Sequence, residues 1–591
     1  MTVTSELALR PPTASADDGA DEPPRSLRVL FLVSAHNGLS QRALIAMTEL
    51  GHRVIVEVVD GAAAMEAAVA THRPELIVCP FLKTLIPESI WSEHRCLIVH
   101  PGPRGDRGPS SLDWAIELEM STWGVTVLEA NAEADAGRVW ATRSFPVRKV
   151  GKSSLYRHEV RHAAIAALVE AIGEIVDGAS VPEAEDPEPG EPEVTGCLRP
   201  LMTQDVRAID WHADTTAAVV RKIRAAEGHP GVLDAIDGTE FHVFGAHREP
   251  TLRGRPGDII AQRTGAICRA TVDGAIWITH LKRRDTSTER FCKLPATRAL
   301  ALAGRDVAVP EVAVELDAPL LLADTYREIA REQDDGVAYL SFDFYNGAMS
   351  TEQCRRLRDA YIELRARRET RVIVLTGGCD YFSNGIHLNV IEASEDPATE
   401  SWRNLQAIDD LVRTIIETDS QLVISALAGD AAAGGVPLAL AADLVVARQD
   451  VVLNPYYRHM GGLYGSEYWT YLLPRRVGLT MTTRLTSAPF TPLGTARAVE
   501  IGLLDATYGA TLDAFHVQTR ALARRLAADP RLGHRLDAKR RRRAQDEQIK
   551  PLEAYRAEEL ARSHDCFFGP DPRYHDARRR FVYKLGPVCT A

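Results

Sequence analysis

The segment from Cys96 to Trp140 holds the first residues whose types and spacing suit acid–base chemistry. His100 ends the apolar run CLIVH and opens a Pro/Gly-rich loop, and Asp135 lies in a second loop after the run WGVTVLEA. A carboxylate that reaches an imidazole fixes its tautomer and raises its basicity, which a general base near neutral pH requires. A single histidine in such a loop is structural more often than catalytic, but Asp135 shifts the interpretation toward a catalytic pair.

Two glycine-rich stretches in the second half could stabilise a developing negative charge. GGCDYFSNGIHLN follows the apolar run RVIVLT, and LAGDAAAGGVPLALAADL follows QLVISA. Small residues after a strand let the backbone approach a ligand, and N–H groups at a helix N-terminus favour negative charge. Each stretch alone is weak evidence because glycine-rich turns are common, but together they predict an oxyanion hole for a thioester.

A phenol and a carboxylate follow these two stretches. Tyr457 and Glu467 lie in LNPYYRHMGGLYGSEYWTYLLPRRVG and are expected to face the same pocket. They would form a usable acid/base pair. The alternative is a buried tyrosine bonded to a structural glutamate, and the neighbouring oxyanion loops favour catalysis over that alternative.

Strands and helices alternate around the first pair and would position it. LRVLFLVS, HRVIVEVVD, ELIVCP and RCLIVH are typical of buried strands, and SQRALIAMTEL and GAAAMEAAVATH are typical of helices between them. Nearly continuous apolar strands alternating with helices predict a doubly wound parallel sheet in an α/β multidomain chain. Ligand chemistry in such sheets occurs beyond the carboxyl ends of the strands, which is where His100 lies.

The length of 591 residues predicts several domains, because one hydrophobic core does not grow that large. We expect a disordered acidic tail at 1–26, an α/β domain at 27–182, a Pro/Glu-rich linker at 183–200, a small β-barrel at 201–310, a connection at 311–335, a second α/β domain at 336–520 and a helical extension at 521–591.

Bulk composition excludes several classes of function. The net charge of −12 argues against nucleic-acid or membrane-surface binding, since either role needs a positive field. Nine cysteines without a CxxC motif indicate reduced thiols rather than a disulfide framework or a zinc knuckle, and no metal site is predicted. No apolar stretch is long enough to span a membrane, and the N-terminus lacks a signal-peptide pattern, so we expect a cytoplasmic protein.

The loop residues of the first half resemble the catalytic loops of the folate-dependent formyltransferases. The resemblance rests on His100, on the turn Asp135-Ala136-Gly137, on Arg107-Gly108 and on Trp114-Ala115-Ile116. It covers about 27–180, and 201–310 resembles the C-terminal barrel of the same family. It implies 10-formyltetrahydrofolate as substrate, with His100 and Asp135 catalytic. It also assigns the loop after the third strand to the pterin, with Phe81, Lys83 and Ile86 as contacts; the alternative is an ordinary strand-to-helix loop.

One position departs from the formyltransferase pattern. The family places an asparagine where this chain has Ile98, and that asparagine donates a hydrogen bond to the formyl oxygen. One such donor is worth about 3–4 kcal/mol of barrier. Three interpretations stay open: another group such as Arg107 donates instead, the acceptor is a nucleophile that needs less help, such as a thiol, or the domain is inactive.

The glycine-rich stretches resemble the crotonase (enoyl-CoA hydratase/isomerase) superfamily over about 336–520, which implies a ββα spiral that binds coenzyme A thioesters, followed by C-terminal helices. The oxyanion amides would then belong to Ile386, after Gly385, and to Gly434. Hydratases carry glutamates where this chain has Pro437 and Tyr457, so hydratase activity is not expected. We interpret His387 as structural and the basic run 539–543 as a solvated helix face rather than a site for CoA phosphates.

The fusion of these two halves resembles the HypX/HoxX family of hydrogenase-maturation proteins. The resemblance implies synthesis of carbon monoxide from 10-formyltetrahydrofolate by formyl transfer to CoA and decarbonylation of formyl-CoA, for nickel–iron hydrogenase and with its maturation machinery as a possible partner. Two alternatives remain: a folate deformylase or small-acceptor formyltransferase with a passive crotonase-like domain, and an assembly scaffold.

Overall fold

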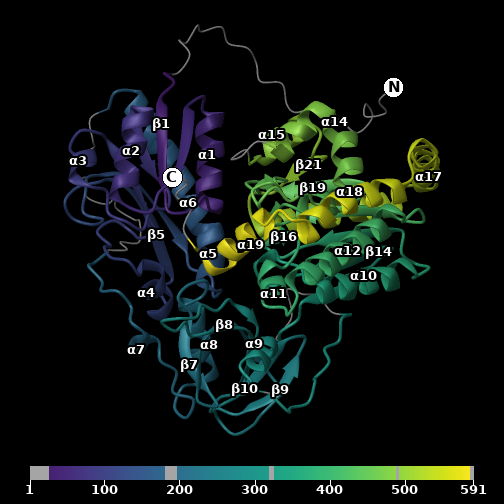
Figure 1. Ribbon diagram of the computed structural model, residues 1–591, viewed down its shortest axis with the longest axis horizontal. Helices are drawn as coiled ribbons and strands as arrows, with labels where there is room; N and C mark the ends of the chain where they lie inside the picture. The colour runs from purple at the N-terminus through teal and green to yellow at the C-terminus, as the bar shows by residue number, and fades with distance from the viewer. Residues whose placement is uncertain (1–24, 180–195, 306, 318–324, 488–491, 586–591) are drawn as a thin grey trace.

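A computed structural model describes residues 25–179, 196–305, 307–317, 325–487 and 492–585. The predicted disordered tail falls outside these residues except for its last two positions, and so does the predicted linker except for 196–200. Figure 1 shows the N-terminal module (purple to blue) beside the green second α/β module, with the teal antiparallel module below both.

The N-terminal sheet has the strand order β2-β1-β3-β4-β5-β6. The first four strands are parallel, as predicted, whereas β5 runs antiparallel to β4 and β6 antiparallel to β5. The loop that joins β5 to β6 covers only residues 130–138, which is too short for the crossover that parallel neighbours require. The strands are β1 (Arg28–Val33), β2 (Arg53–Val58), β3 (Leu76–Cys79), β4 (Cys96–His100), β5 (Thr122–Glu129) and β6 (Val139–Pro146).

Helices cover both faces of this sheet. On one face α1 and α6 bury an apolar cluster with β1, β4 and β5, and on the other α2 and α3 pack on β1 and β3. The side chain of Asn37 caps α1 by accepting a hydrogen bond from Ser40 N, and Gly51 follows its end with φ +86°. The helices are α1 (Gly38–Glu49), α2 (Ala62–His72), α3 (Glu88–Trp91), α4 (Ser111–Glu117), α5 (Lys152–Leu155), the π-helical η1 (Tyr156–Val160) and α6 (Arg161–Val176).

The middle module is an antiparallel sheet in the order β7-β8-β11-β10-β9, with β12 on β11 and helix α8 packed against β8. Its elements are α7 (Gln204–Arg207), α8 (Thr216–Ala225), β7 (Val232–Ile236), β8 (Thr239–Glu249), β9 (Ile259–Arg263), β10 (Ala266–Ala270), β11 (Ala275–Arg283), β12 (Leu294–Pro295) and α9 (Ala296–Leu302).

The second α/β module repeats a strand, a short strand and a helix, so that two sheets form side by side. The large sheet has the order β13-β14-β15-β17-β19-β21, and the small parallel sheet has the order β16-β18-β20. The large sheet contains β13 (Ile329–Asp334), β14 (Val337–Phe342), β15 (Val372–Thr376), β17 (Leu422–Leu427), β19 (Leu444–Arg448) and β21 (Ala506–Tyr508). The small sheet contains β16 (Tyr381–Ser383), β18 (Asp430–Ala432) and β20 (Leu453–Asn454).

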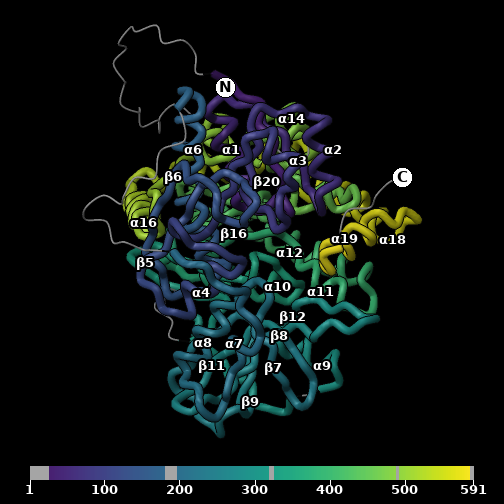
Figure 2. The backbone as a smooth tube through the Cα atoms, turned by 90° about the vertical axis from the view of Figure 1, so that its left-hand side faces the viewer, coloured from purple at the N-terminus to yellow at the C-terminus, as the bar shows by residue number. Residues whose placement is uncertain are grey.

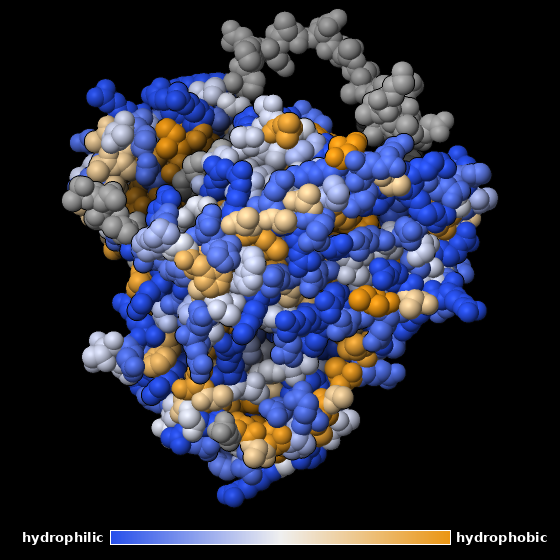
Figure 3. Space-filling view, turned by 45° about the vertical axis from the view of Figure 1, so that its right-hand side comes forward, coloured by the Kyte–Doolittle hydropathy of each residue, from blue (hydrophilic) through white to orange (hydrophobic). Residues whose placement is uncertain are grey.

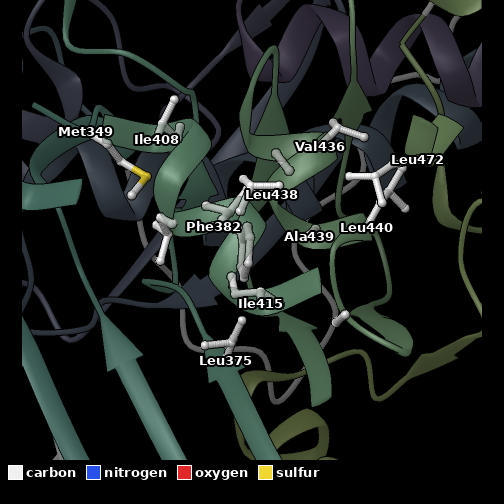
Figure 4. Close-up of a cluster of buried hydrophobic side chains, with 14 of the residues drawn as sticks. Met349, Leu375, Phe382, Ile408, Ile415, Val436, Leu438, Ala439, Leu440 and Leu472 are labelled. Carbon is white, nitrogen blue, oxygen red and sulfur yellow. The ribbon is translucent and has the colours of Figure 1, made fainter. Parts of the chain in front are cut away.

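Helices of the spiral enclose the largest hydrophobic core of the chain. Figure 4 shows Phe382, which belongs to β16 of the small sheet, in a cluster that includes Ile408 and Ile415 of one helix and Leu438 of another. The helices are η3 (Tyr345–Gly347), α10 (Thr351–Arg365), α11 (Leu388–Glu392), α12 (Pro397–Ile416), α13 (Gly435–Leu440), α14 (Trp469–Ser487) and α15 (Thr495–Glu500).

The C-terminal helices pack back against the spiral, and the last of them, α19, contacts helix α11. Helix α18 packs on α12 and α14, and α19 packs on α11 (Figure 2). The helices are α16 (Leu512–Ala528), α17 (Leu532–Ile549), α18 (Leu552–Phe568) and α19 (Arg573–Tyr583). No helix in the described parts of the chain combines the length and apolarity needed to cross a membrane, and Figure 3 shows a face dominated by hydrophilic residues.

Ion pairs join the two α/β modules. Arg161 of α6 donates to Asp430 of β18 over 2.7 Å, and Arg42 of α1 pairs with Asp450 over 2.9 Å. Asp380, directly before β16, accepts from three residues of α5 and η1, which are Ser154, Arg157 and His158 at 2.8–3.0 Å. The docking surface of the N-terminal module therefore lies against the loops that the sequence assigns to the oxyanion hole.

Candidate active sites and the cavity between them

His100, at the end of β4, lies between two carboxylates. Its Nε2 is 3.0 Å from Asp106 Oδ2, and its Nδ1 is 3.3 Å from Asp135 Oδ1. The predicted His100–Asp135 pair is therefore brought together, with Asp106 as a second partner that the sequence reasoning missed. The available signal was its position, six residues after His100 in the same Pro/Gly loop.

This arrangement sets the charge of the imidazole. Burial alone would lower the pKa of His100, but the hydrogen bonds to Asp106 and Asp135 outweigh it and raise that pKa to about 9. Burial acts to raise the pKa of Asp135, and the contact with His100 outweighs it and lowers that pKa. At neutral pH the site is an imidazolium between carboxylates, so His100 is a proton donor before it can act as a base.

The other predicted folate residues divide between the cavity wall and the surface. Phe81, Lys83, Ile86 and Ile98 line a cavity in front of His100. Arg107 donates instead to Glu133 over 3.1 Å, with 40% of its side chain exposed. Its guanidinium is thus engaged on the outer side of the loop and does not replace the missing asparagine donor in this structure.

In the second module the two glycine-rich loops meet as predicted. A Cβ on Gly385 would lie 3.1 Å from Gly434 N, and Gly385 has φ +77°. A Cβ on Gly434 would lie 2.3 Å from Glu467 Oε1, so any side chain there would displace that carboxyl group. Glycine at both positions allows the two loops to approach each other, and Gly434 lies against Glu467 of the predicted acid/base pair.

Tyr457 and Glu467 form a buried hydrogen-bonded pair. Tyr457 OH donates to Glu467 Oε2 over 3.1 Å, and Ser466 N donates to the same oxygen over 3.0 Å. Glu467 and Tyr468 both have positive φ, +62° and +58°, a strained backbone that persists only where the surroundings impose it. Burial, with the nearby charge of Asp409, raises the pKa of Glu467 to about 8. At neutral pH this side chain is a protonated acid.

One cavity of about 990 Å³ is lined by both α/β modules. From the first module its wall includes His100, Asp135 and the Phe81–Ile86 loop, and from the second it includes Asn384 and Ala432. These last two residues are each two positions from Ile386 and Gly434. The cavity therefore runs from the imidazolium site to the edge of the glycine pair.

Comparisons with known proteins agree with this architecture. A model of the enoyl-CoA hydratase/isomerase family matches 332–567, and a model of the formyl transferase C-terminal domain matches 201–293. The hydrogenase maturation factor HoxX of Bradyrhizobium diazoefficiens is 46% identical over 561 residues, 95% of each chain. This chain belongs to the HypX/HoxX family of hydrogenase maturation factors. The predicted family and the predicted multidomain α/β fold are confirmed.

Structures of the HypX/HoxX family extend the match to three dimensions. HypX of Aquifex aeolicus, solved in complex with tetrahydrofolic acid, is 40% identical and superimposes with a TM-score of 0.90 over 96% of this chain and 98% of that chain. Methionyl-tRNA formyltransferase of Variovorax paradoxus is 28% identical over 232 residues, 38% of this chain and 69% of that protein.

Behind Glu467, this member of the HypX/HoxX family has two further buried acids that the sequence reasoning missed. Asp409 of α12 accepts from Glu467 N over 2.7 Å and from Ser466 Oγ over 2.8 Å. Glu559 of α18 accepts from Tyr468 N over 2.9 Å. Burial raises the pKa of Asp409 to about 7 and that of Glu559 to about 8. Helices distant in sequence thus hold the turn that carries Glu467.

Two remaining predictions concern side chains away from the cavity. His387 caps α11, its Nδ1 accepting from Val390 N, and burial lowers its pKa to about 4, as a structural histidine requires. The interpretation of 539–543 as a solvated face is wrong for Lys539, which is buried and donates to Gln421 O over 3.0 Å and to Asp443. Arg540 and Arg543 do pair along the helix surface.

His158, Cys379 and Asp380 offer ligand atoms within 4.8 Å of one another. Arg157 already occupies one oxygen of Asp380, and burial holds the Cys379 thiol well above its usual pKa. Through Asp380 the group acts as a clamp between the two α/β modules.

Proposed function

We propose that the protein makes carbon monoxide from 10-formyltetrahydrofolate in two steps, formyl transfer to the thiol of coenzyme A and decarbonylation of formyl-CoA. The CO would supply the iron site of nickel–iron hydrogenase in the cytoplasm. The observation that carries the proposal is the cavity lined by both modules, because it begins at His100 and ends two residues from Ile386 and Gly434, so that a labile formyl thioester made at one site stays at a high effective concentration near the other.

In the first step the thiol sulfur attacks the formyl carbon, the carbon–sulfur bond forms and the bond from carbon to folate N10 breaks. Negative charge on the formyl oxygen is stabilised by the positive charge of the His100 imidazolium, in place of the hydrogen bond that Ile98 cannot donate. Asp135 lies in the cavity wall and accepts the thiol proton, which finally protonates N10. This assignment replaces the expectation of a neutral histidine base.

In the second step the formyl proton leaves the carbon, the carbon–sulfur bond breaks with its electron pair on sulfur, and CO departs. The amides of Ile386 and Gly434 hold the carbonyl oxygen in place. Glu467 enters protonated, gives its proton to the thiolate and, with Tyr457, takes up the formyl proton. The step consumes and releases no net proton, so Glu467 is regenerated as the acid.

Basic side chains on the cavity wall suit the anionic parts of both substrates. Lys83, Lys152, Arg157 and Arg161 all line the cavity, and each could contact a folate carboxylate or a CoA phosphate. Lys83 also lies 5.5 Å from the Phe81 ring centroid, in the loop assigned to the pterin.

Incubation of the protein with 10-formyltetrahydrofolate labelled with ¹³C on the formyl carbon tests the proposal. In the presence of CoA we expect ¹³CO, captured by reduced myoglobin and read from its visible spectrum, and in its absence none. Labelled formate as the sole product, at a rate independent of CoA, would instead support a folate deformylase with a passive second module. If the protein does not consume the formyl donor, the remaining interpretation is an assembly scaffold.

A further inference from the structure

The last residues of the predicted linker, 196–200, form a strap across the loop that follows His100. Gly196 N donates to Arg104 O over 3.0 Å, Arg107 N donates to Cys197 O over 3.3 Å, and Arg199 N donates to Arg107 O over 3.0 Å. Further along the strap, Trp114 Nε1 donates to Pro200 O over 2.9 Å. The last residues of the predicted linker are therefore fixed on the active-site loop.

Glycines make this close approach possible. A Cβ on Gly108 would lie 2.2 Å from Arg199 O, and one on Gly196 would lie 1.8 Å from Asp106 N. A Cβ on Gly102 would lie 2.3 Å from Asp106 Oδ2 and 2.4 Å from His100 Nε2. Backbone without side chains on both partners is thus what lets the strap and the loop pack behind the imidazole.

The strap delivers Arg199 to the second carboxylate of His100. Arg199 Nη1 donates to Asp106 Oδ1 over 2.5 Å, and the other oxygen of Asp106 contacts the imidazole. The Asp106 side chain is 1% exposed and that of Arg199 15%. The guanidinium carbon also lies 5.2 Å from the Trp123 ring centroid, which fixes its plane. One oxygen of the Asp106 carboxylate therefore accepts from Arg199, and the other oxygen contacts His100.

The two carboxylates on the ring differ in access. Asp135 lines the cavity, has 19% of its side chain exposed and accepts from Gly108 N over 3.3 Å. Asp106 does not belong to the described cavity wall, and it lies on the opposite side of the imidazole with Arg199 behind it. Asp135 can therefore contact a substrate in the cavity, and Asp106 cannot.

We propose that Asp106, held by Arg199, is the positioning carboxylate of His100, and that Asp135, on the cavity side of the ring, is the carboxylate that exchanges protons with the reacting atoms. This inference rests on the proposed function of the first module and is independent of the second. Asp106 fixes the ring through Nε2 and keeps it cationic, while Nδ1 contacts Asp135 at the cavity wall. The arrangement compensates for Ile98, because a fixed imidazolium stabilises the formyl oxygen where a neutral amide would otherwise donate.

A titration of His100 must separate the effects of four charged groups around its ring. Asp106 and Asp135 contact it directly, Arg199 acts on it through Asp106, and Arg107 acts on Asp135. Asp106→Asn keeps the shape and removes one charge from direct contact. Opposite charges at such distances shift a pKa by roughly 1–3 units, so the His100 pKa should fall by at least about one unit from about 9.

The first experiment is an NMR titration of the full chain carrying ¹³C-labelled histidine, with the His100 signal assigned by its loss in His100→Gln. It needs no substrate, so it remains informative even if the protein makes no CO. A His100 pKa within 0.3 units of wild type in Asp106→Asn overturns the proposal.

The second experiment measures consumption of 10-formyltetrahydrofolate. Arg199→Gln should lower kcat at least tenfold and leave KM for the folate within twofold, because Arg199 acts through Asp106; Arg199→Lys should restore at least a third of kcat. Arg221→Gln, an arginine on α8 paired with Glu119, is the matched control and should equal wild type. An unchanged kcat in Arg199→Gln, or a tenfold rise in KM, overturns the positioning role.

If Asp106→Asn does not fold, the two variants Arg199→Gln and Arg199→Lys provide the test. The His100 titration is then repeated on Arg199→Lys. An absence of formyl transfer in wild type would refute the proposed function, and the titration of His100 would still decide which carboxylate holds the ring.

Discussion

Replacing Glu467 by glutamine should make the protein more stable at neutral and alkaline pH and stop the release of carbon monoxide. Both donors to Glu467, Tyr457 OH and Ser466 N, reach the same oxygen Oε2, so a glutamine carbonyl can accept from both. The substitution therefore keeps the hydrogen bonds and removes only the ability to ionise.

The magnitude follows from the raised pKa of Glu467, about 8 against an ordinary value of 4.5. A carboxyl whose pKa is higher in the folded state contributes stability that is complete below pH 4.5 and is lost as pH rises toward 8. At pH 7 ionisation of Glu467 stabilises the unfolded chain but not the folded one. The free energy of unfolding is therefore lower by about 3 kcal/mol, at about 1.4 kcal/mol per pKa unit. Glutamine removes that cost.

Thermal unfolding from pH 5 to 8.5 measures the effect. The midpoint of the variant should exceed that of wild type by a difference that grows with pH, reaching roughly 5–10 °C near pH 7 for a module of this size. Glu352→Gln, whose parent side chain is 80% exposed on α10, is the control and should follow wild type throughout. In the ¹³C assay the Glu467 variant should consume the formyl donor and release no CO.

Two results would refute this reasoning. Parallel midpoint curves for wild type and Glu467→Gln would show that Glu467 titrates normally in the folded protein. Undiminished CO release by the variant would show that a different group delivers the proton to sulfur.

Three further predictions concern the cavity and its supports. Ala432→Phe should narrow the passage, so folate consumption continues while the yield of CO per formyl group falls, as measured in the ¹³C assay. Asp380→Asn, which leaves Arg157 and His158 without their partner, should cost about 2–3 kcal/mol in thermal unfolding, because a partly buried ion pair is broken from one side. Asp409→Asn should lower the pKa of Glu467 and shift the alkaline limit of CO release down by about one unit, since a neutral side chain no longer disfavours its ionisation. An unchanged pH profile would contradict the last expectation.

The residues at strand ends were predictable from the sequence because their position depends on local periodicity. His100 closes an apolar run that forms β4, and the glycine-rich stretches follow β15 and β17. Asp135 was predictable as a loop residue, since it follows β5. The rule that parallel strands present their carboxyl ends to one edge applies to His100 and to the glycine-rich stretches, whereas β5 runs antiparallel to β4 and Asp135 reaches His100 through the path of the loop at 130–138.

Asp106, Asp409 and Glu559 were not predictable from periodicity. Asp106 reaches the imidazole because a Pro/Gly loop folds back on itself, and its partner Arg199 belongs to the last residues of the predicted linker. Asp409 and Glu559 come from α12 and α18, helices whose packing against the turn at Ser466 is a long-range contact. Amphipathic patterns identify the buried face of such helices, and they do not identify which turn an acid on that face will meet.

The direction of the strands explains why a fusion of these two modules places their loops on one cavity. In an open α/β sheet the functional loops lie beyond the carboxyl ends of the parallel strands, and the parallel strands of one sheet share one such edge. The edge of the first module, with His100 and Asp135, and the loop edge of the second, with Asn384 and Ala432, both belong to the cavity wall. Two domains joined only by a flexible tether would rarely adopt this relative orientation. In this chain the ion pairs of Asp380 and Asp430 with α5, η1 and α6 stabilise that orientation. The interface thus holds the relative orientation that the proposed transfer of a single carbon requires, and we expect it to be as sensitive to substitution as the sites themselves.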